Sequence, residues 1–169
     1  LDEADAFLKR FGSAMIKPID SQASHGVRRV SRVEEARDAF WEALKYSHAE
    51  KSVLLEEVID GQEFTVDGIM TPSGYVTTAI SKKRHFPGNG SVADRLLFSW
   101  HDDAFDYSQL AYANEQVVLS FGLPFGLTHA EYIYSNGEFY LIEIAARGGG
   151  TLISSTIVPA MSGIDSNEW

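Results

Sequence analysis

Two strand–turn–strand patterns favour antiparallel sheet as the core of this chain. Leu127–Tyr134 and Glu138–Ile144 each alternate apolar and polar residues, and Asn136-Gly137 lies between them. Asn-Gly is a preferred pair for a short hairpin turn, because both residues adopt a positive φ readily. Glu63–Met70 and Tyr75–Ile80 repeat the pattern around a Pro-Ser-Gly turn. We therefore expect two β-hairpins.

Other segments have helical spacing. Apolar residues recur three and four positions apart in Leu1–Arg10 and in Phe105–Phe121, and a glycine lies just beyond each segment. Ser31 with an acid three residues later matches a capping box, which predicts that a helix begins there and buries a face within residues 36–44. A further helix is expected over Thr151–Met161.

Short apolar runs predict further strands at Ala14–Ile19, Val27–Val30 and Val53–Leu55, the last of them buried. Ser81–Ala93 is basic and then rich in glycine, so we expect an exposed loop there. This order of helices and antiparallel strands predicts an α+β fold with two lobes, residues 1–60 and residues 61–169.

Composition and charge restrict the class of function. The 169 residues have a net charge of -10, are 44% hydrophobic and include no cysteine. Such an acidic chain is not expected to bind nucleic acid, which requires clustered Lys and Arg. The lack of cysteine excludes disulfides and thiolate chemistry and fits the cytoplasm. No apolar run approaches the roughly 20 residues that span a bilayer, so no membrane contact is expected.

The ends of the sequence suggest a segment of a longer protein. The chain begins at Leu1 without a methionine and stops at Trp169 without an obvious finish. The sequence carries no signal for the oligomeric state.

A lysine and a loop of small residues follow the first predicted strand. Lys17 lies near the end of Ala14–Ile19, and the loop Asp20–Gly26 follows it. The small and hydroxyl residues of Ser24-His25-Gly26 let backbone N–H groups approach phosphate oxygens, and the ammonium group of Lys17 can offset the negative charge of the phosphates. The loop is not a Walker A sequence, so a plain solvent-exposed turn is the alternative.

Acidic residues surround the expected junction of the lobes. Glu56 and Glu57 close one strand, and Glu63 begins the next. The backbone of a linking strand near Val58 can pair with a purine edge, and Glu63 can accept hydrogen bonds from ribose hydroxyls. The alternative is that these acids are merely solvated.

Glu131 and Glu143 form a more specific pair. They lie on the two strands of one predicted hairpin, among apolar neighbours, and strand alternation lets both side chains face the same side. Two carboxylates so close and half buried repel each other unless a cation or a proton intervenes. Mg²⁺, or Mn²⁺ in its place, suits such a site, because Mg²⁺ is bound by one or two carboxylates together with phosphates. A strand edge with solvated glutamates is the alternative.

Basic residues near glycines supply two further candidates. Arg147 precedes Gly148-Gly149-Gly150, so its guanidinium and the glycine N–H groups could bind an anion, although a flexible linker is the alternative. The run Lys82–His85, which includes Lys83, could close over phosphates as a mobile lid. It could equally be a solvated turn.

The ordered set of these segments resembles the ATP-grasp superfamily. The similarity is carried by Met15–Val27, by Leu54–Asp67, and by His129-Ala130-Glu131 through Leu141–Gly149. Within that superfamily the chain is most similar to the carboxylate–amine ligases, which include amino-acid ligases, glycinamide-ribonucleotide synthetases and the large subunit of carbamoyl-phosphate synthase.

The resemblance implies an ATP site between two α+β lobes. It implies that Lys17 and Ser24-His25-Gly26 meet the phosphates and that the backbone of Glu56, Glu57 and Val58 pairs with adenine. By the same resemblance Glu63 takes the ribose, and Arg147 acts in catalysis with Lys17. From its place in the basic run, Lys83 is also assigned to nucleotide binding. Glu131 and Glu143 would hold Mg²⁺.

The implied reaction converts a small-molecule carboxylate into an acyl-phosphate, which an amine then attacks. Two departures from the family pattern stand out. Ala145 occupies a position where many members have asparagine, which puts a two-metal site in doubt, and the phosphate loop has a single glycine. A nucleotide-binding or regulatory module without catalysis is therefore the second hypothesis, and an interaction domain with surface acids is the third. We expect this segment alone to bind nucleotide weakly and to turn over little.

Overall fold

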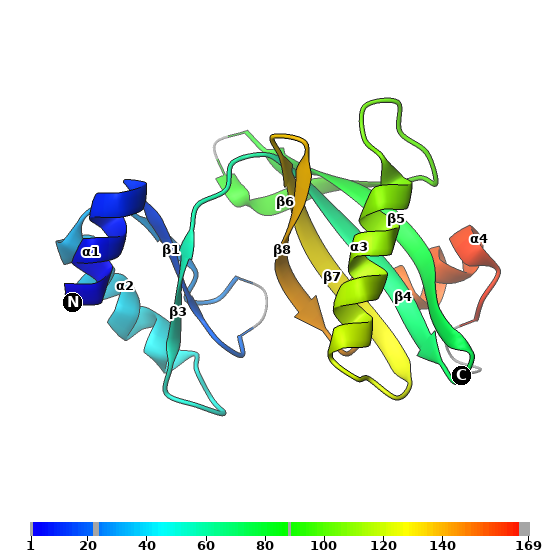
Figure 1. The fold of residues 1–169 in the computed structure, drawn as a ribbon, viewed down its shortest axis with the longest axis horizontal. Helices are drawn as coiled ribbons and strands as arrows, with labels where there is room; N and C mark the ends of the chain where they lie inside the picture. Colours follow the sequence, from blue (N-terminus) through cyan, green and yellow to red (C-terminus); the bar gives the residue numbers. More distant parts are fainter. Residues whose placement is uncertain (1, 22–23, 88, 166–169) are drawn as a thin grey trace. The chain divides into compact units, whose positions relative to one another are not determined.

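The computed structural model describes residues 2–21, 24–87 and 89–165. By its contacts the chain divides into two compact units, Leu1–Ile59 and Asp60–Trp169, each described by itself below (Figure 1). None of the helices in these described ranges is long and apolar enough to cross a membrane.

The first unit packs two helices on a three-stranded antiparallel sheet. Its elements in chain order are α1 (Asp2–Phe11), β1 (Ala14–Pro18), β2 (Arg28–Val30), α2 (Val33–Lys45) and β3 (Val53–Glu57), with the strand order β2-β1-β3. The core joins Leu8 of α1 and Ile16 of β1 to the three alanines 36, 39 and 43 of α2. These small side chains let α2 approach the sheet closely.

Two local predictions for the first unit are wrong. β3 forms, but it is an edge strand and is not buried, since Leu54 remains 41% exposed. Ser31 does not cap α2. The N-cap is the next residue, Arg32, whose side chain makes no capping hydrogen bond. Instead, the Glu35 carboxylate accepts a hydrogen bond from the Ser31 N–H at 3.0 Å. The acid four residues on, rather than three, reaches back to the helix start.

The second unit is built on a five-stranded antiparallel sheet with the order β6-β5-β4-β7-β8. Its elements in chain order are β4 (Gln62–Thr71), β5 (Gly74–Phe86), β6 (Asn89–Phe98), α3 (Tyr107–Ser120), β7 (Gly126–Ser135), β8 (Glu138–Ala145), a π-helix η1 (Ile153–Ile157) and α4 (Val158–Ser162). Both predicted hairpins are confirmed, as are the helix before Gly122 and a helical segment within the predicted range Thr151–Met161.

The two faces of this sheet differ in chemistry. Helix α3 lies along one face, where Phe64, Ile80 and Tyr132 pack with Tyr107 and Leu110 into an apolar core (Figure 1). Because side chains alternate along a strand, their sequence neighbours project from the opposite face. On that opposite face Ile153 of η1 and Val158 of α4 pack against Ala79. The rest of the face carries polar residues, and the candidate site lies there.

The prediction of an exposed loop over Ser81–Ala93 is wrong for the residues that the structure describes. Gly88 lies outside the described residues. β5 continues as a strand to Phe86, and β6 returns from Asn89, with Lys83 opposite Leu96 and Arg84 opposite Arg95. The charges of the basic run have partners, such as Arg84 with Asp94 at 2.6 Å. Lys82–His85 therefore lies in the strand β5, with register shifts on either side of His85, and not in the exposed loop that was predicted.

Candidate functional site

The polar face of the second unit is ordered by the strand register. Glu143, Glu131, Thr65 and Ser81 lie opposite one another across β8, β7, β4 and β5. Directly opposite residues of antiparallel strands project from the same face. Thr65 and Ser81 close this row with a buried hydroxyl–hydroxyl hydrogen bond of 2.7 Å.

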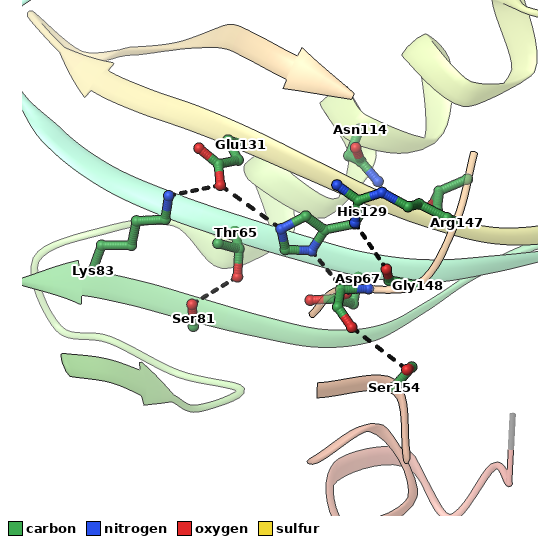
Figure 2. A network of polar contacts seen from close by, with 12 residues as sticks. Thr65, Asp67, Ser81, Lys83, Asn114, His129, Glu131, Arg147, Gly148 and Ser154 are labelled. Atoms are coloured by element: carbon green, nitrogen blue, oxygen red, sulfur yellow. Dashed lines mark hydrogen bonds and ion pairs between the residues drawn. The ribbon is translucent and has the colours of Figure 1, made fainter. Parts of the chain in front are cut away.

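Ion pairs join the next positions on the same face. The Nζ atom of Lys83 lies 2.7 Å from Glu131 Oε1 (Figure 2). It also lies 3.6 Å from Glu63 Oε2. Glu63 also lies 3.3 Å from Nε2 of His85. The structure thus brings together three residues that the sequence assigned to the nucleotide or the metal: Glu63, Lys83 and Glu131.

His129 extends this chain of contacts towards β4. Its Nδ1 lies 2.9 Å from Asp67 Oδ1, and its Nε2 lies 3.8 Å from Glu131 Oε1 (Figure 2). Burial by itself lowers the pKa of an imidazole, but the contacts with Asp67 and Glu131 outweigh burial and raise the pKa of His129 to about 9. His129 is therefore a cation at neutral pH.

The same contacts fix the charge of Glu131. Burial raises the pKa of a carboxyl group, but His129 and Lys83 outweigh burial and lower the pKa of Glu131 to about 2. Glu131 is therefore an anion at neutral pH, held between two cationic side chains.

Glu143 completes the predicted metal pair in a different environment from the expected one. It shares a face of the sheet with Glu131, as the sequence predicted, and a register shift at Glu131/Tyr132 places the two directly opposite each other. Glu143 is exposed, however, rather than half buried. Among the described residues, no group of three or more His, Asp or Glu side chains could hold a metal ion. Two facing carboxylates fit Mg²⁺ when phosphate oxygens and waters supply its remaining ligands. Ala145, opposite His129, offers no ligand.

The glycine segment after β8 is packed, and this contradicts the flexible-linker alternative. The Gly149 N–H donates to Asp67 Oδ1 at 3.2 Å, so it points into the protein and not towards an external anion. A Cβ at Gly148 would lie 2.7 Å from Ser154 Cβ. Arg147 is exposed, and its Nη1 donates to the Gly148 carbonyl at 3.1 Å (Figure 2). An anion nest of all three glycines is therefore wrong.

The residues assigned from the first unit form a separate set. Lys17 lies on β1 with a side chain 16% exposed, and its Nζ is 2.7 Å from Glu56 Oε2 on β3. Glu57 is exposed at the end of β3, and Val58 is half-buried just beyond it. Their roles towards a nucleotide stay predictions.

The predicted phosphate loop is held by local contacts where the structure describes it; Gln22 and Ala23 lie outside the described residues. Ser24 and Gly26 have φ values of 56° and 75°. The His25 ring stacks on Tyr46 with centroids 5.5 Å apart. A Cβ at Gly26 would lie 2.8 Å from the Tyr46 ring, so this glycine serves close packing as well as backbone freedom.

Asp67 and His129 are the site residues that sequence reasoning missed. His129 stands two positions before Glu131, and Asp67 stands two positions after Thr65, so alternation alone places each on the polar face. Their contact required the register of β4 and β7, which local patterns do not provide.

Comparison with known proteins agrees with this geometry. A family model described as an ATP-grasp domain matches residues 12–156. Over 142 residues the chain is 32% identical to dapdiamide A synthase of Enterobacter agglomerans, an alignment that covers 80% of this chain and 33% of that protein. Over 120 residues it is 31% identical to the D-alanine–D-alanine ligase of Pseudoalteromonas translucida (strain TAC 125), covering 62% of this chain and 38% of the ligase.

A solved structure shares the fold at lower identity. The biotin carboxylase domain of Hydrogenobacter thermophilus 2-oxoglutarate carboxylase, in complex with MgADP, ADP and bicarbonate, superposes with a TM-score of 0.74 and 17% identity, covering 99% of this chain and 38% of that chain. The chain thus spans between 33% and 38% of the length of these three proteins. The matched family model and the shared architecture show that the chain belongs to the ATP-grasp family.

Proposed function

We propose that this chain is the nucleotide-binding part of an ATP-dependent ligase that joins a carboxylate to an amine through an acyl-phosphate. The observation that carries the proposal is the facing pair Glu131 and Glu143, with Lys83 at 2.7 Å from Glu131. The synthase and ligase names of the relatives support the reaction class. Because a D-alanine–D-alanine ligase is among them, we take an amino acid as the carboxylate or amine substrate.

The chemistry asks for charge stabilisation and positioning. A carboxylate oxygen attacks the γ-phosphorus of ATP, the bond to the β–γ bridging oxygen breaks, and ADP leaves. The amine then attacks the acyl carbon, inorganic phosphate leaves, and the amine loses a proton. Mg²⁺, when bound, would offset negative charge on the phosphoryl oxygens.

The side chains take roles that match their positions. Glu131 and Glu143 hold Mg²⁺, with Mn²⁺ as a possible substitute, and Lys83 orients Glu131 and meets nucleotide oxygens. Arg147, exposed at the end of β8, meets the transferred phosphoryl group. Glu63 binds the ribose.

Residues of the first unit are assigned to the nucleotide on the family resemblance. Lys17 and Ser24-His25-Gly26 bind the phosphates, and the backbone of Glu56, Glu57 and Val58 pairs with adenine. We place the protein in the cytoplasm, which suits a chain without cysteine.

A nucleotide-binding module without catalysis is the second candidate, and Ala145 is the observation that favours it. Because the side chain of Ala145 has no donor atom, this hairpin would offer a metal only the two carboxylates as side-chain ligands, beside phosphate oxygens and waters. Binding without turnover would follow if the phosphoryl group were poorly held. Nucleotide binding alone does not separate the two candidates, whereas acyl-phosphate formation does.

Thermal unfolding with ATP, with and without Mg²⁺, tests the site. ATP at about 100 times its Kd stabilises a one-site protein by about 2.7 kcal/mol. For a chain of this size that corresponds to a Tm rise of roughly 5–10 °C. We expect the rise to require Mg²⁺, to be lost in Glu143→Gln and to persist in Glu138→Gln, an exposed glutamate on the same strand. Equal shifts in both variants would refute the metal pair.

A further inference from the structure

Asp67 connects three segments that are distant in sequence. It lies on the central strand β4 and is 2% exposed. Its Oδ1 accepts hydrogen bonds from Nδ1 of His129 on β7, at 2.9 Å, and from the Gly149 N–H, at 3.2 Å. One carboxylate oxygen therefore holds both the imidazole ring and the glycine segment against β4. Within the described part of the chain its other oxygen, Oδ2, is buried without a partner.

The packing around Gly149 allows no side chain. A Cβ there would lie 2.7 Å from Asp67 Oδ1 and 2.9 Å from His129 Nδ1. Real Cβ atoms do not approach so closely, so the segment would have to move away from Asp67. Gly150 differs, because a Cβ added to it meets nothing within 4 Å and its φ is not positive. The two neighbouring glycines thus offer a matched pair of positions.

The backbone that follows is unfavourable and has to be held by its surroundings. Thr151 and Leu152 have φ values of 54° and 64°, in the left-handed region that non-glycine residues avoid. The π-helix η1 begins directly after them. On one side the segment is fixed by the bond from Gly149 to Asp67, and on the other by the Ile153 N–H, which donates to the Gly150 carbonyl at 3.0 Å.

We propose that Asp67 is a positioning residue that fixes the segment Arg147–Gly150 and the ring of His129 beside Glu131. The hydrogen bond described for the Arg147 side chain is the one to the carbonyl of the neighbouring Gly148. The placement of its guanidinium therefore depends on how the glycine segment is held. The consequence for Arg147 rests on the proposed function, in which this guanidinium meets the transferred phosphoryl group. The anchoring itself does not rest on it.

Amide hydrogen exchange at residue 149, followed by NMR on the 169-residue chain, tests the anchoring. Relative to amides of β4, exchange at this position should be about 10- to 100-fold faster in Asp67→Ala, because a hydrogen bond to a charged group is lost. Asp67→Asn should retain protection, since the amide oxygen of asparagine can accept from both donors.

Two glycine variants keep the test decisive where Asp67→Ala does not fold. Gly149→Ala leaves Asp67 and His129 in place but forces the amide away, so exchange at 149 should accelerate as in Asp67→Ala. Gly150→Ala should leave exchange at 149 unchanged. Unchanged protection of residue 149 in Asp67→Ala, or in Gly149→Ala if the former does not fold, would overturn the anchoring.

The affinity for Mg-ATP tests the link to Arg147. Asp67→Ala should weaken binding about 10-fold or more, Asp67→Asn should restore it, and Arg147→Ala should cause no further loss when added to Asp67→Ala. If the losses of affinity in Asp67→Ala and Arg147→Ala add fully in the double variant, Asp67 does not act through Arg147, and the link is overturned. Absence of Mg-ATP binding by the unmodified protein would instead refute the proposed function, and the exchange experiment would still decide the anchoring.

Discussion

Replacing Lys83 by methionine removes the cation closest to Glu131 while keeping most of the aliphatic side chain. Lys83 is only 12% exposed, and its Nζ lies 2.7 Å from Glu131. The contacts of Glu131 lower its pKa from 4.5 to about 2, which corresponds to about 3 kcal/mol of stability at neutral pH. His129 shares this stabilisation, so we expect Lys83→Met to lower the free energy of unfolding by about 1–2 kcal/mol at pH 7.

The pH dependence follows from the direction of that shift. A carboxyl group whose pKa is depressed by folding stabilises the folded state above its unfolded pKa, near 4.5, and the stabilisation is lost as the pH falls towards about 2. Of the about 3 kcal/mol at neutral pH, about 2 kcal/mol remains at pH 3.5. The difference between the unmodified protein and Lys83→Met should therefore be constant above pH 5 and shrink below it.

Urea unfolding in the presence of EDTA, followed through the NMR signals of β4, measures this difference in the second unit without a metal. Arg84→Met is the matched control. Arg84 is the next residue, and its side chain is 59% exposed although that of its partner Asp94 is 14% exposed, so a smaller change than for Lys83→Met is expected. A Lys83→Met protein as stable as the unmodified one at pH 7, or a pH-independent difference, would refute the view that this ion pair holds Glu131.

Two further predictions concern the scaffold. Asp106→Ala should lower the free energy of unfolding of the second unit by about 1 kcal/mol in urea titrations, because the Asp106 carboxylate accepts N-cap bonds from two amides of α3 at 2.9 and 3.1 Å. Asp103 is fully exposed, so Asp103→Ala should leave this free energy unchanged. Equal losses in the two variants would contradict the cap. Gly26→Ala should destabilise the first unit more than Gly12→Ala by roughly 1 kcal/mol or more. Both glycines have a positive φ, but only at Gly26 does a Cβ meet Tyr46; equal losses in thermal unfolding would show that the Tyr46 contact does not matter.

Local signals predicted the parts of the fold that depend on neighbouring residues. The Asn136-Gly137 turn has φ values of 51° and 91°, as its sequence requires, and it sets the register as far as Tyr132 opposite Leu141. A register shift between Glu131 and Tyr132, which the turn does not specify, then places Glu131 opposite Glu143. The predicted N-cap of α2 was wrong by one position. Glu34 and Glu35 are both acids close to Ser31, so the local sequence does not show which of them reaches back, and in the folded helix it is Glu35.

Long-range pairing decided the parts that the sequence did not reveal. Ser81–Ala93 has the composition of a loop, yet pairing of β5 with β6 turns most of it into sheet. Because β5 and β7 both pair with β4, Lys83 lies beside Glu131, 48 residues further along the chain. Asp67 and His129 are 62 residues apart, and their contact depends on the register of β4 with β7. No periodicity within either strand specifies that register, although alternation places both side chains on the polar face.

Transfer of oxygen from substrate to phosphate tests the proposed reaction most directly. The protein in its full natural length is incubated with Mg-ATP, an amine and a candidate amino acid in which both carboxylate oxygens are ¹⁸O, and the inorganic phosphate is analysed by mass spectrometry. An acyl-phosphate leaves one carboxylate oxygen on phosphorus, so one ¹⁸O should appear in each phosphate released with the product, and Glu143→Gln should abolish the transfer. Product and ADP formed with unlabelled phosphate would contradict the acyl-phosphate mechanism.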